Sequence, residues 1–290
     1  MSKSIKNLTK RYTHYYLRSI IPLSFKLREL ISPLWAANAA YRLWFRTRRY
    51  KINKKQAQAL AAARKEILRT SVCDVPVFIW GEGTNTIVLV HGWSGNAGQL
   101  AMLAVYLSEN GMRVIAYDGP AHGGSEGNST NILQLSAVLQ SVCAHYGPIS
   151  SLLGHSFGCA VVAHAHKNAL SQVKRLIFVS CSGPADYLLS QYFTYLDLKD
   201  KTRAYFMKLL RQHFGENVLH EISVNQNMAQ CAAKVLLVHD KRDSIVPSEK
   251  TSDLLAVVRG ASLVLTSGLG HQHILNSQRL KKLVLEFVVY

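Results

Sequence analysis

The sequence predicts an α/β fold in which a mainly parallel, twisted sheet is flanked by helices on both faces. From residue 71 onward, short β-rich apolar runs alternate with longer helical patterns, which is typical of parallel strands joined by crossover helices. Polar and glycine-rich segments directly follow several of these runs, and sites in open α/β sheets lie at the carboxyl ends of strands. A length of 290 residues allows one large domain with appendages.

The individual elements can be placed along the chain from apolar runs, helical periodicity and turn residues. Two short strands at 75–80 and 86–90 are separated by Gly81-Glu-Gly83-Thr-Asn, which predicts a hairpin. The remaining predicted strands are 112–117, 149–153, 175–180, 234–239 and 262–265, and the predicted helices are 97–110, 130–146, 158–168, 248–258 and 275–287.

Positive charge is concentrated at the start of the chain. Residues 1–70 hold 17 of the 34 Lys and Arg residues but 2 of the 17 Asp and Glu residues, so this segment carries +15 and residues 71–290 carry +2. We therefore predict two parts, a basic, partly amphipathic helical extension over 1–70 and a near-neutral globular domain over 71–290. Within the extension, an Ala-rich helix is expected over 54–70.

Two interpretations of the basic extension stay open. Its helices over 27–69 could pack their apolar faces on the globular domain, which we favour for 54–69. Alternatively, residues 1–50, which include Trp35 and Trp44, could lie on an anionic membrane surface. A transmembrane span is not predicted, because charged residues and a proline interrupt the apolar stretch. Nucleic acid is not an expected partner, since the segment shows no known binding motif.

The five cysteines indicate a reducing compartment. They are odd in number, scattered through apolar segments, and form no Cys-x-x-Cys pair, so we expect small buried side chains and no disulfide framework. The predicted location is cytoplasmic, with peripheral binding to the inner membrane face if the basic extension contacts lipid. The pattern does not predict an oligomeric state.

A sharp turn around Ser156 is the strongest local signal. The apolar run ending at Leu153 predicts a strand, a helix is expected to begin close behind it, and Gly154 and Gly158 flank the serine two residues away on either side. The absent Cβ atoms let strand and helix approach each other and tolerate a strained serine backbone. Gly-x-Ser-x-Gly in this context is typical of a nucleophile elbow.

Further motifs follow other predicted strands and complete a family pattern. They are His91-Gly-Trp93-Ser-Gly, Asp118-Gly-Pro-Ala-His122-Gly, His239-Asp240-Lys-Arg-Asp243-Ser-Ile-Val-Pro and Gly268-Leu-Gly-His271-Gln-His273. Over residues 76–288 the chain resembles the α/β-hydrolase superfamily, most closely its compact bacterial serine hydrolases. The resemblance implies the α/β-hydrolase fold with a small helical lid inserted over 183–230.

The resemblance also implies a role for each site residue. Ser156 would be the nucleophile, Asp243 the acid and His271 the base, while the backbone N–H groups of Trp93 and Phe157 would form the oxyanion hole. A serine hydroxyl needs a nearby base to become nucleophilic, and a carboxylate fixes the tautomer of that base. Backbone donors then stabilise the developing oxyanion.

Alternative residues exist for two of these roles. Asp240 and, less directly, Asp186 are candidate acids, and His273 is a second candidate base. The remaining histidines near strand ends are expected to be structural, fixing loops through hydrogen bonds; they are His91, His122 and His155. No metal or cofactor is predicted, because zinc-site and dinucleotide motifs are missing from the sequence.

The predicted activity is hydrolysis of carboxylic esters by a serine hydrolase, with a small-molecule ester as substrate. Aromatic residues of the 183–230 interval suggest an apolar acyl group, although they could equally pack the lid. Two alternatives remain, a thioesterase or lipase-like enzyme at a membrane surface and a non-catalytic scaffold of the same fold.

Overall fold

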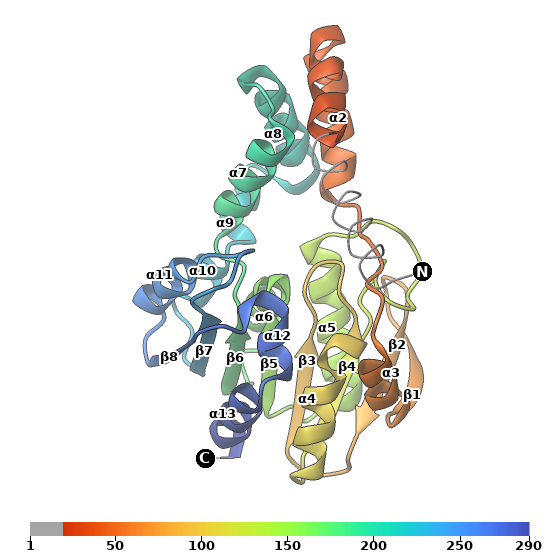
Figure 1. The fold of residues 1–290 in the computed structure, drawn as a ribbon, viewed down its shortest axis with the longest axis vertical. Helices are drawn as coiled ribbons and strands as arrows, with labels where there is room; N and C mark the ends of the chain where they lie inside the picture. Colours follow the sequence, from red (N-terminus) through yellow and green to blue (C-terminus); the bar gives the residue numbers. More distant parts are fainter. Residues whose placement is uncertain (1–19, 290) are drawn as a thin grey trace, which may run out of the picture. The chain divides into compact units, whose positions relative to one another are not determined.

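The protein forms two compact units. The structure, a computed structural model, describes residues 20–289 (Figure 1). One unit combines the described residues up to Phe45 with residues 186–218, and the larger unit contains residues 46–185 and 219–290. The predicted basic extension, residues 1–70, therefore spans parts of both units, which divide after Phe45.

The larger unit is built on an eight-stranded sheet with the order β1-β2-β4-β3-β5-β6-β7-β8. β2 is antiparallel to its neighbours β1 and β4, and all other pairs are parallel. The predicted α/β class is therefore confirmed. The strands are β1 (Arg64–Arg69), β2 (Asp74–Trp80), β3 (Thr86–Val90), β4 (Arg113–Tyr117), β5 (Ser151–His155), β6 (Arg175–Val179), β7 (Lys234–Asp240) and β8 (Ala261–Thr266).

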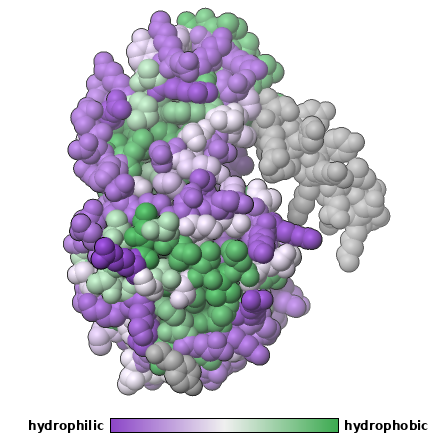
Figure 2. Space-filling view, turned by 90° about the vertical axis from the view of Figure 1, so that its left-hand side faces the viewer, coloured by the Kyte–Doolittle hydropathy of each residue, from purple (hydrophilic) through white to green (hydrophobic). Residues whose placement is uncertain are grey.

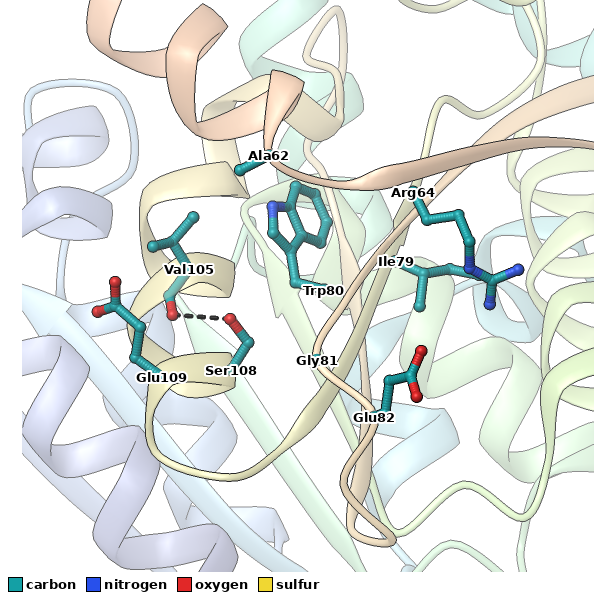
Figure 3. A pocket seen from close by; sticks show the side chains of 9 residues that line it. All are labelled: Ala62, Arg64, Ile79, Trp80, Gly81, Glu82, Val105, Ser108 and Glu109. Atoms are coloured by element: carbon teal, nitrogen blue, oxygen red, sulfur yellow. Dashed lines mark hydrogen bonds between the residues drawn. The ribbon is translucent and has the colours of Figure 1, made fainter.

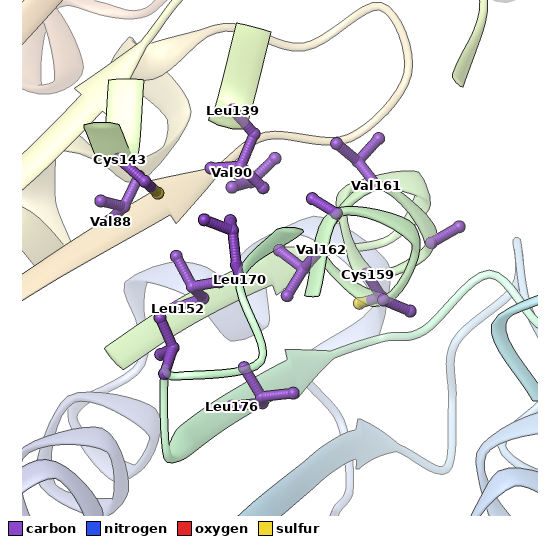
Figure 4. Packing of buried hydrophobic residues seen from close by; sticks show 14 of the residues in the cluster. Val88, Val90, Leu139, Cys143, Leu152, Cys159, Val161, Val162, Leu170 and Leu176 are labelled. Atoms are coloured by element: carbon purple, nitrogen blue, oxygen red, sulfur yellow. The ribbon is translucent and has the colours of Figure 1, made fainter. Parts of the chain in front are cut away.

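Helices cover both faces of the sheet because its central strands are apolar on both sides. Successive residues alternate between two buried clusters: Val88 and Leu152 belong to one cluster (Figure 4), and Leu89 and Leu153 belong to the other. The helices packed on the first face are α5 (Ile132–Tyr146), α6 (Phe157–Ala169), α10 (Val224–Met228) and α11 (Glu249–Val257). The second face is covered by α4 (Ala97–Glu109) and α13 (Gln278–Val289), with η1 (Ile274–Asn276).

The predicted hairpin between residues 75 and 90 is wrong. β2 and β3 are not neighbours, because β4 lies between them. The two glycines of the connection serve close packing instead: a Cβ on Gly81 would lie 2.3 Å from the Met112 carbonyl oxygen, and one on Gly83 would lie 1.9 Å from that of Gly111. The loop thus packs on the turn that leads into β4.

The helix predicted over 54–70 is wrong in its second half. α3 (Lys54–Ala61) begins with a capping box between Asn53 and Gln56 and ends at Ala61. β1 follows and forms the actual hairpin with β2, closed by Thr70, whose hydroxyl donates to the Cys73 carbonyl oxygen over 2.7 Å. The alternation of polar and apolar residues over 64–69 is short, so the preceding Ala-rich pattern dominates a prediction from sequence.

Residues 46–50 join the larger unit through hydrogen bonds to the loop after β4. Thr47 donates its hydroxyl to the Ala121 carbonyl oxygen over 2.7 Å. The Arg49 guanidinium donates to the Ser125 and Gly127 carbonyl oxygens over 2.8 and 3.1 Å. This part of the basic segment is therefore used in packing.

The smaller unit is a helical assembly with its own apolar interior. It contains a helix over residues 20–31, α2 (Pro33–Trp44), α7 (Ala185–Leu196) and α8 (Asp200–Phe214). Small residues on α2 allow a close approach to α8. The Tyr192 hydroxyl donates to the Ala40 carbonyl oxygen over 2.8 Å, and Phe193 packs on Phe206 with ring centroids 5.1 Å apart.

The interval predicted as a lid is divided between the two units. Residues 186–218 form helices of the smaller unit, whereas 219–230 belong to the larger unit, where α10 packs on α6. Phe193 and Phe206 are buried inside the smaller unit. Among residues 20–289, no helix is both long enough and apolar enough to span a bilayer.

Candidate active site

Ser156 occupies a strained turn between β5 and α6. Its φ of 54° and ψ of −120° lie in a region that residues with a side chain rarely adopt. A Cβ on Gly154 would lie 2.6 Å from the Gly158 carbonyl oxygen, and one on Gly158 would lie 2.4 Å from that of Val90. The two glycines thus permit the packing that holds the serine at the carboxyl edge of the sheet.

Asp243 and His271 come together at the same edge. Asp243 follows β7, and His271 lies in α12 (Gly270–His273) after β8. His271 Nδ1 lies 2.7 Å from Asp243 Oδ2. The other carboxylate oxygen, Oδ1, accepts the backbone N–H groups of Ile245 and Val246 over 2.8 and 2.9 Å. The carboxyl group is therefore fixed in the orientation that meets the imidazole.

His239 is a second imidazole on the same carboxylate, and the sequence reasoning assigned it no role. Its Nε2 lies 3.3 Å from Asp243 Oδ2 and 3.0 Å from the Val246 carbonyl oxygen. Because a carbonyl oxygen can only accept, Nε2 carries the hydrogen. Nδ1 then accepts from the Thr251 hydroxyl over 2.6 Å. The one feature of the sequence that could have pointed to His239 is its place near the end of β7, at the edge of the sheet where Asp243 lies.

Asp243 is a carboxylate at neutral pH. Its side chain is fully buried, and burial raises the pKa of a carboxyl group. Hydrogen bonds from His239, His271 and the Val246 amide outweigh that effect and hold the pKa of Asp243 well below its ordinary value. The Asp243 carboxylate therefore presents a negative charge to His271 Nδ1.

The loop that carries His271 also contacts the elbow. His155, the residue before Ser156, has its Nε2 3.0 Å from the His271 carbonyl oxygen, and the two rings lie 5.0 Å apart. Burial lowers the pKa of His155 to about 3, so its ring is neutral and Nε2–H donates to that carbonyl. His271 is thereby held next to the backbone of Ser156.

Asp240 connects the loop that carries Asp243 to the loop that precedes His271. This fully buried side chain accepts the Arg242 N–H and the Thr266 hydroxyl over 2.9 and 2.7 Å. It also accepts the N–H groups of Gly268 and Leu269 over 3.2 and 3.0 Å. Burial alone would raise the pKa of Asp240, but these hydrogen bonds lower it to about 2. Asp240 is thus a structural anchor, while Asp243 contacts the imidazole.

We expect Asp240→Asn to lower the free energy of unfolding by about 2–4 kcal/mol at pH 7, because an amide cannot accept all these hydrogen bonds. The carboxylate contributes stability above its unfolded pKa of about 3.9, which is lost as the pH falls towards about 2. The variant should therefore lose less stability than the unmodified protein between pH 5 and pH 3. Urea unfolding at several pH values measures both effects.

The control for this prediction is Asp74→Asn, a carboxylate whose side chain is 58% exposed. That variant should change the free energy of unfolding by less than about 0.5 kcal/mol. Equal stability of Asp240→Asn and Asp74→Asn at pH 7 would contradict the anchoring role.

The backbone amides of Trp93 and Phe157 flank the serine. Phe157 begins α6, and the turn that contains Trp93 passes over the elbow: a Cβ on Gly92 would lie 3.0 Å from the Ser156 Cβ. The Trp93 and Phe157 rings pack edge to face with centroids 5.2 Å apart. Among residues 20–289, neither amide N–H has a hydrogen-bond acceptor. Both remain available to an oxyanion.

Two other histidines near strand ends support the loops, in agreement with the structural role expected for them. His91 Nε2 accepts the Gly119 N–H over 3.0 Å, and His122 Nε2 accepts the Ser94 N–H over 2.9 Å. Burial lowers their pKa values to about 4 and about 3, so both rings are neutral. His122 thereby fixes the residue next to Trp93.

The rival candidates lie elsewhere. His273 is exposed, and it is His271 that contacts Asp243. Asp186 is exposed in the first turn of α7, within the smaller unit. In the part of the chain that the structure describes, no group of three His, Cys, Asp or Glu side chains is placed to hold a metal ion.

One hollow of about 380 Å³ lies at the opposite edge of the sheet (Figure 3). Trp80, which lines it, pairs with Val114 near the start of β4, so the hollow is at the amino-terminal edge of the parallel strands. Its lining includes none of the predicted site residues; it consists of Ala62, Arg64, Ile79, Trp80, Gly81, Glu82, Val105, Ser108 and Glu109.

Comparison with known proteins finds relatives and structural neighbours that are hydrolases by name. A serine hydrolase-like protein of Dictyostelium discoideum is 28% identical over 117 residues, 38% of this chain and 33% of that protein. The chain thus matches about a third of that relative's length.

Two solved structures illustrate the similarity in fold. Est1E of Butyrivibrio proteoclasticus, solved with ferulic acid, is 17% identical with a TM-score of 0.63, over 78% of this chain and all (100%) of Est1E. The thioesterase domain from the curacin biosynthetic pathway is 19% identical with a TM-score of 0.59, over 79% of this chain and 100% of that domain. At these identities the likeness concerns the fold.

The sequence profile described as the alpha/beta hydrolase family matches residues 87–284. This range includes more than half of the chain and every predicted site residue. The sheet order, the strained serine turn and the profile agree with one another. The chain therefore belongs to the alpha/beta hydrolase family.

Proposed function

We propose that this protein is a serine hydrolase that cleaves carboxylic esters through an acyl-enzyme. The proposal rests on one arrangement: the buried Asp243 carboxylate is hydrogen-bonded to His271 over 2.7 Å, on a loop held to the residue before Ser156. Membership of the hydrolase family supports a hydrolytic reaction. The ester as substrate and the roles of the three side chains are part of the proposal.

In the first step, Ser156 Oγ attacks the ester carbonyl carbon while its proton passes to His271 Nε2. Asp243 holds Nδ1–H towards itself, so Nε2 is the free base, and its charge stabilises the imidazolium that forms. The carbonyl oxygen becomes an oxyanion, which accepts the N–H groups of Trp93 and Phe157.

Collapse of this intermediate breaks the bond to the leaving alcohol, which takes the proton from His271 Nε2. The acyl group remains on Ser156 Oγ. Water then repeats the sequence: His271 accepts a proton from it, hydroxide adds to the acyl carbon, and Ser156 leaves with that proton. The carboxylic acid and the free enzyme result.

An apolar acyl group fits the immediate surroundings of the serine best. The partly exposed rings of Trp93 and Phe157, the second of which is next to Ser156 in the chain, pack edge to face with centroids 5.2 Å apart. The aromatic residues of the predicted lid are weaker support, since Phe193 and Phe206 are buried in the helical unit. We therefore base the acyl preference on the two rings next to the nucleophile.

The test is the initial rate of hydrolysis of p-nitrophenyl esters from acetate to palmitate, beside labelling with a fluorophosphonate. We expect activity with a maximum at medium-chain esters, and a covalent adduct located on Ser156 by peptide mass spectrometry. Ser156→Ala should lose both the adduct and at least about 10³-fold in rate.

Other outcomes separate the alternatives. An optimum at acetate would contradict the apolar acyl preference while leaving an esterase. Adduct formation with no ester turnover, but with hydrolysis of acyl thioesters, would favour a thioesterase. Neither adduct nor turnover in a folded protein would favour a non-catalytic scaffold and overturn the proposal.

A further inference from the structure

The helices over 20–31 and 33–44 carry apolar side chains on two opposite faces. One face is buried inside the smaller unit and includes Phe25, Ala36 and Ala40. The opposite face is exposed, and we call it the outer stripe; it consists of Ile20 (55% exposed), Leu23 (56%), Leu27 (56%), Leu30 (77%), Ile31 (75%), Leu34 (48%) and Trp35 (49%). Single exposed apolar residues are common, but a contiguous row of this length marks an interaction site.

The outer stripe runs over two helices that meet at Ser32, the N-cap of the second, where the backbone is extended (φ −160°, ψ 116°). The Ser32 N–H donates to the Arg28 carbonyl oxygen over 2.8 Å, and the Ala36 N–H donates to the Ser32 carbonyl oxygen over 3.0 Å. Within the first helix the members recur three or four residues apart, which is the spacing of one helix face. At 1.5 Å per residue the part of the stripe in this helix is roughly 17 Å long. Figure 2 shows apolar surface at one end of the smaller unit.

Cations lie on both sides of the outer stripe. At about 100° per residue, Lys26 and Arg28 fall on opposite flanks of it. The Lys26 side chain is 55% exposed and forms an ion pair with Asp197 over 2.8 Å, and the Arg28 guanidinium lies 5.2 Å from the centre of the Trp35 ring. Residues 1–19 lie outside the described residues; their sequence adds five Lys and Arg and no acidic residue. Apolar surface bordered by cations is the pattern of a helix that lies in an anionic lipid interface.

A second copy of the chain is a less favourable occupant. A two-fold pairing of outer stripes would bring identical cationic flanks, and the basic segments that precede them, close to one another. Like charges held together at an interface oppose association. An anionic bilayer takes up the same apolar side chains and gains from the same cations.

We propose that the outer stripe docks the protein on an anionic phospholipid surface, with both helices lying in the plane of the interface and Arg28 directed to the headgroups. This inference does not depend on the proposed esterase activity. It selects the membrane interpretation for the described part of 1–50, whereas residues 46–50 are used in packing.

The experiment is flotation of the full-length protein with vesicles of phosphatidylcholine alone or with 30% phosphatidylglycerol. We expect binding to the anionic vesicles, weaker binding to neutral ones, and weaker binding in 0.5 M salt because the charges are screened. The double variant Leu30→Gln/Ile31→Gln should lower the partition coefficient by about tenfold or more. Arg28→Gln should lower it on anionic vesicles only.

The matched controls lie in the larger unit. Ile67 is 58% exposed and Leu133 is 41% exposed, so Ile67→Gln/Leu133→Gln removes comparable apolar surface. Arg69, whose side chain is 91% exposed, is the control for Arg28. These variants, and Ser156→Ala, should partition like the unmodified protein. If the double variant fails to fold by circular dichroism, Leu27→Gln replaces it.

Three results would overturn the proposal. The unmodified protein could fail to float with anionic vesicles. Binding could persist unchanged when the outer stripe is altered. Sedimentation velocity could show a dimer that Leu30→Gln/Ile31→Gln dissociates, without lipid binding, in which case a second copy covers the stripe. Because flotation does not require turnover, an inactive but membrane-bound protein would contradict the esterase proposal alone.

Discussion

His271→Ala is expected to lower kcat/KM for a p-nitrophenyl ester by at least about 10⁴-fold, whereas His273→Ala should leave it within about threefold. His271 Nδ1 lies 2.7 Å from the Asp243 carboxylate, so Nε2 is the nitrogen that acts as the base in the proposed mechanism. His273 lies two residues away in α12 but is exposed to solvent. The two variants therefore carry the same substitution at two positions of one short helix, of which only His271 contacts Asp243.

The measurement is a steady-state ester assay on both variants, together with the rate of fluorophosphonate labelling of Ser156. Loss of His271 should slow labelling as well as turnover, since the serine would lack its base. Thermal unfolding within a few degrees of the unmodified protein would show that the loss is chemical. A large loss in His273→Ala with retained activity in His271→Ala would exchange the two roles.

Many strands of the larger unit could be predicted because each is a short, continuous apolar run that is recognisable from local sequence alone. β5 and β7 are apolar on both faces, and the residues that follow them are those of the site. Prediction from local sequence failed for the order of the strands, where the strands that pair are far apart in the chain. Nothing near residues 81–85 indicates that β4, more than 25 residues further along, inserts between β2 and β3, since sheet order depends on tertiary packing.

The smaller unit shows a second limit of prediction from sequence. The basic segment and the interval 183–230 were interpreted separately, yet residues 20–45 and 186–218 pack together. Their contact depends on side chains far apart in the chain, such as Glu29, whose carboxylate accepts the Lys199 N–H over 2.9 Å. Such a pair leaves no local periodicity, so a single sequence does not reveal it.

Within the candidate site, the sequence pattern predicts Ser156, Asp243 and His271, but it does not predict the side chains that support them. Asp240 is a rival candidate acid in the sequence because of its place at the end of β7. The structure instead shows its carboxylate engaged with residues 266–269. His239 begins the same motif, but nothing in the sequence indicates that its imidazole contacts the Asp243 carboxylate. Both belong to the same short segment as Asp243, so spacing alone could not distinguish an acid from the residues that position it.

Asp243→Asn is expected to lower kcat by about 10⁴-fold while the protein remains folded. The amide is nearly isosteric with the carboxylate, and its oxygen can still accept the Ile245 and Val246 N–H groups that now bind Oδ1. Its nitrogen would then face His271 Nδ1 as a donor. That nitrogen forces the hydrogen of His271 onto Nε2, so the imidazole can no longer accept the serine proton.

The pH dependence of stability separates this tautomer effect from a structural one. The pKa of Asp243 lies well below its ordinary value in the folded protein, so its carboxylate contributes stability above the unfolded pKa of about 3.9 and loses it as the pH falls. Asp243→Asn should therefore be less stable than the unmodified protein at pH 7, and the difference should shrink towards pH 3.

Activity that rises with added hydroxide above pH 9, where a direct base can replace the imidazole, would support the tautomer explanation. A variant that retains more than a tenth of the original kcat would show that His271 does not depend on Asp243, and the acid would have to be sought at another residue.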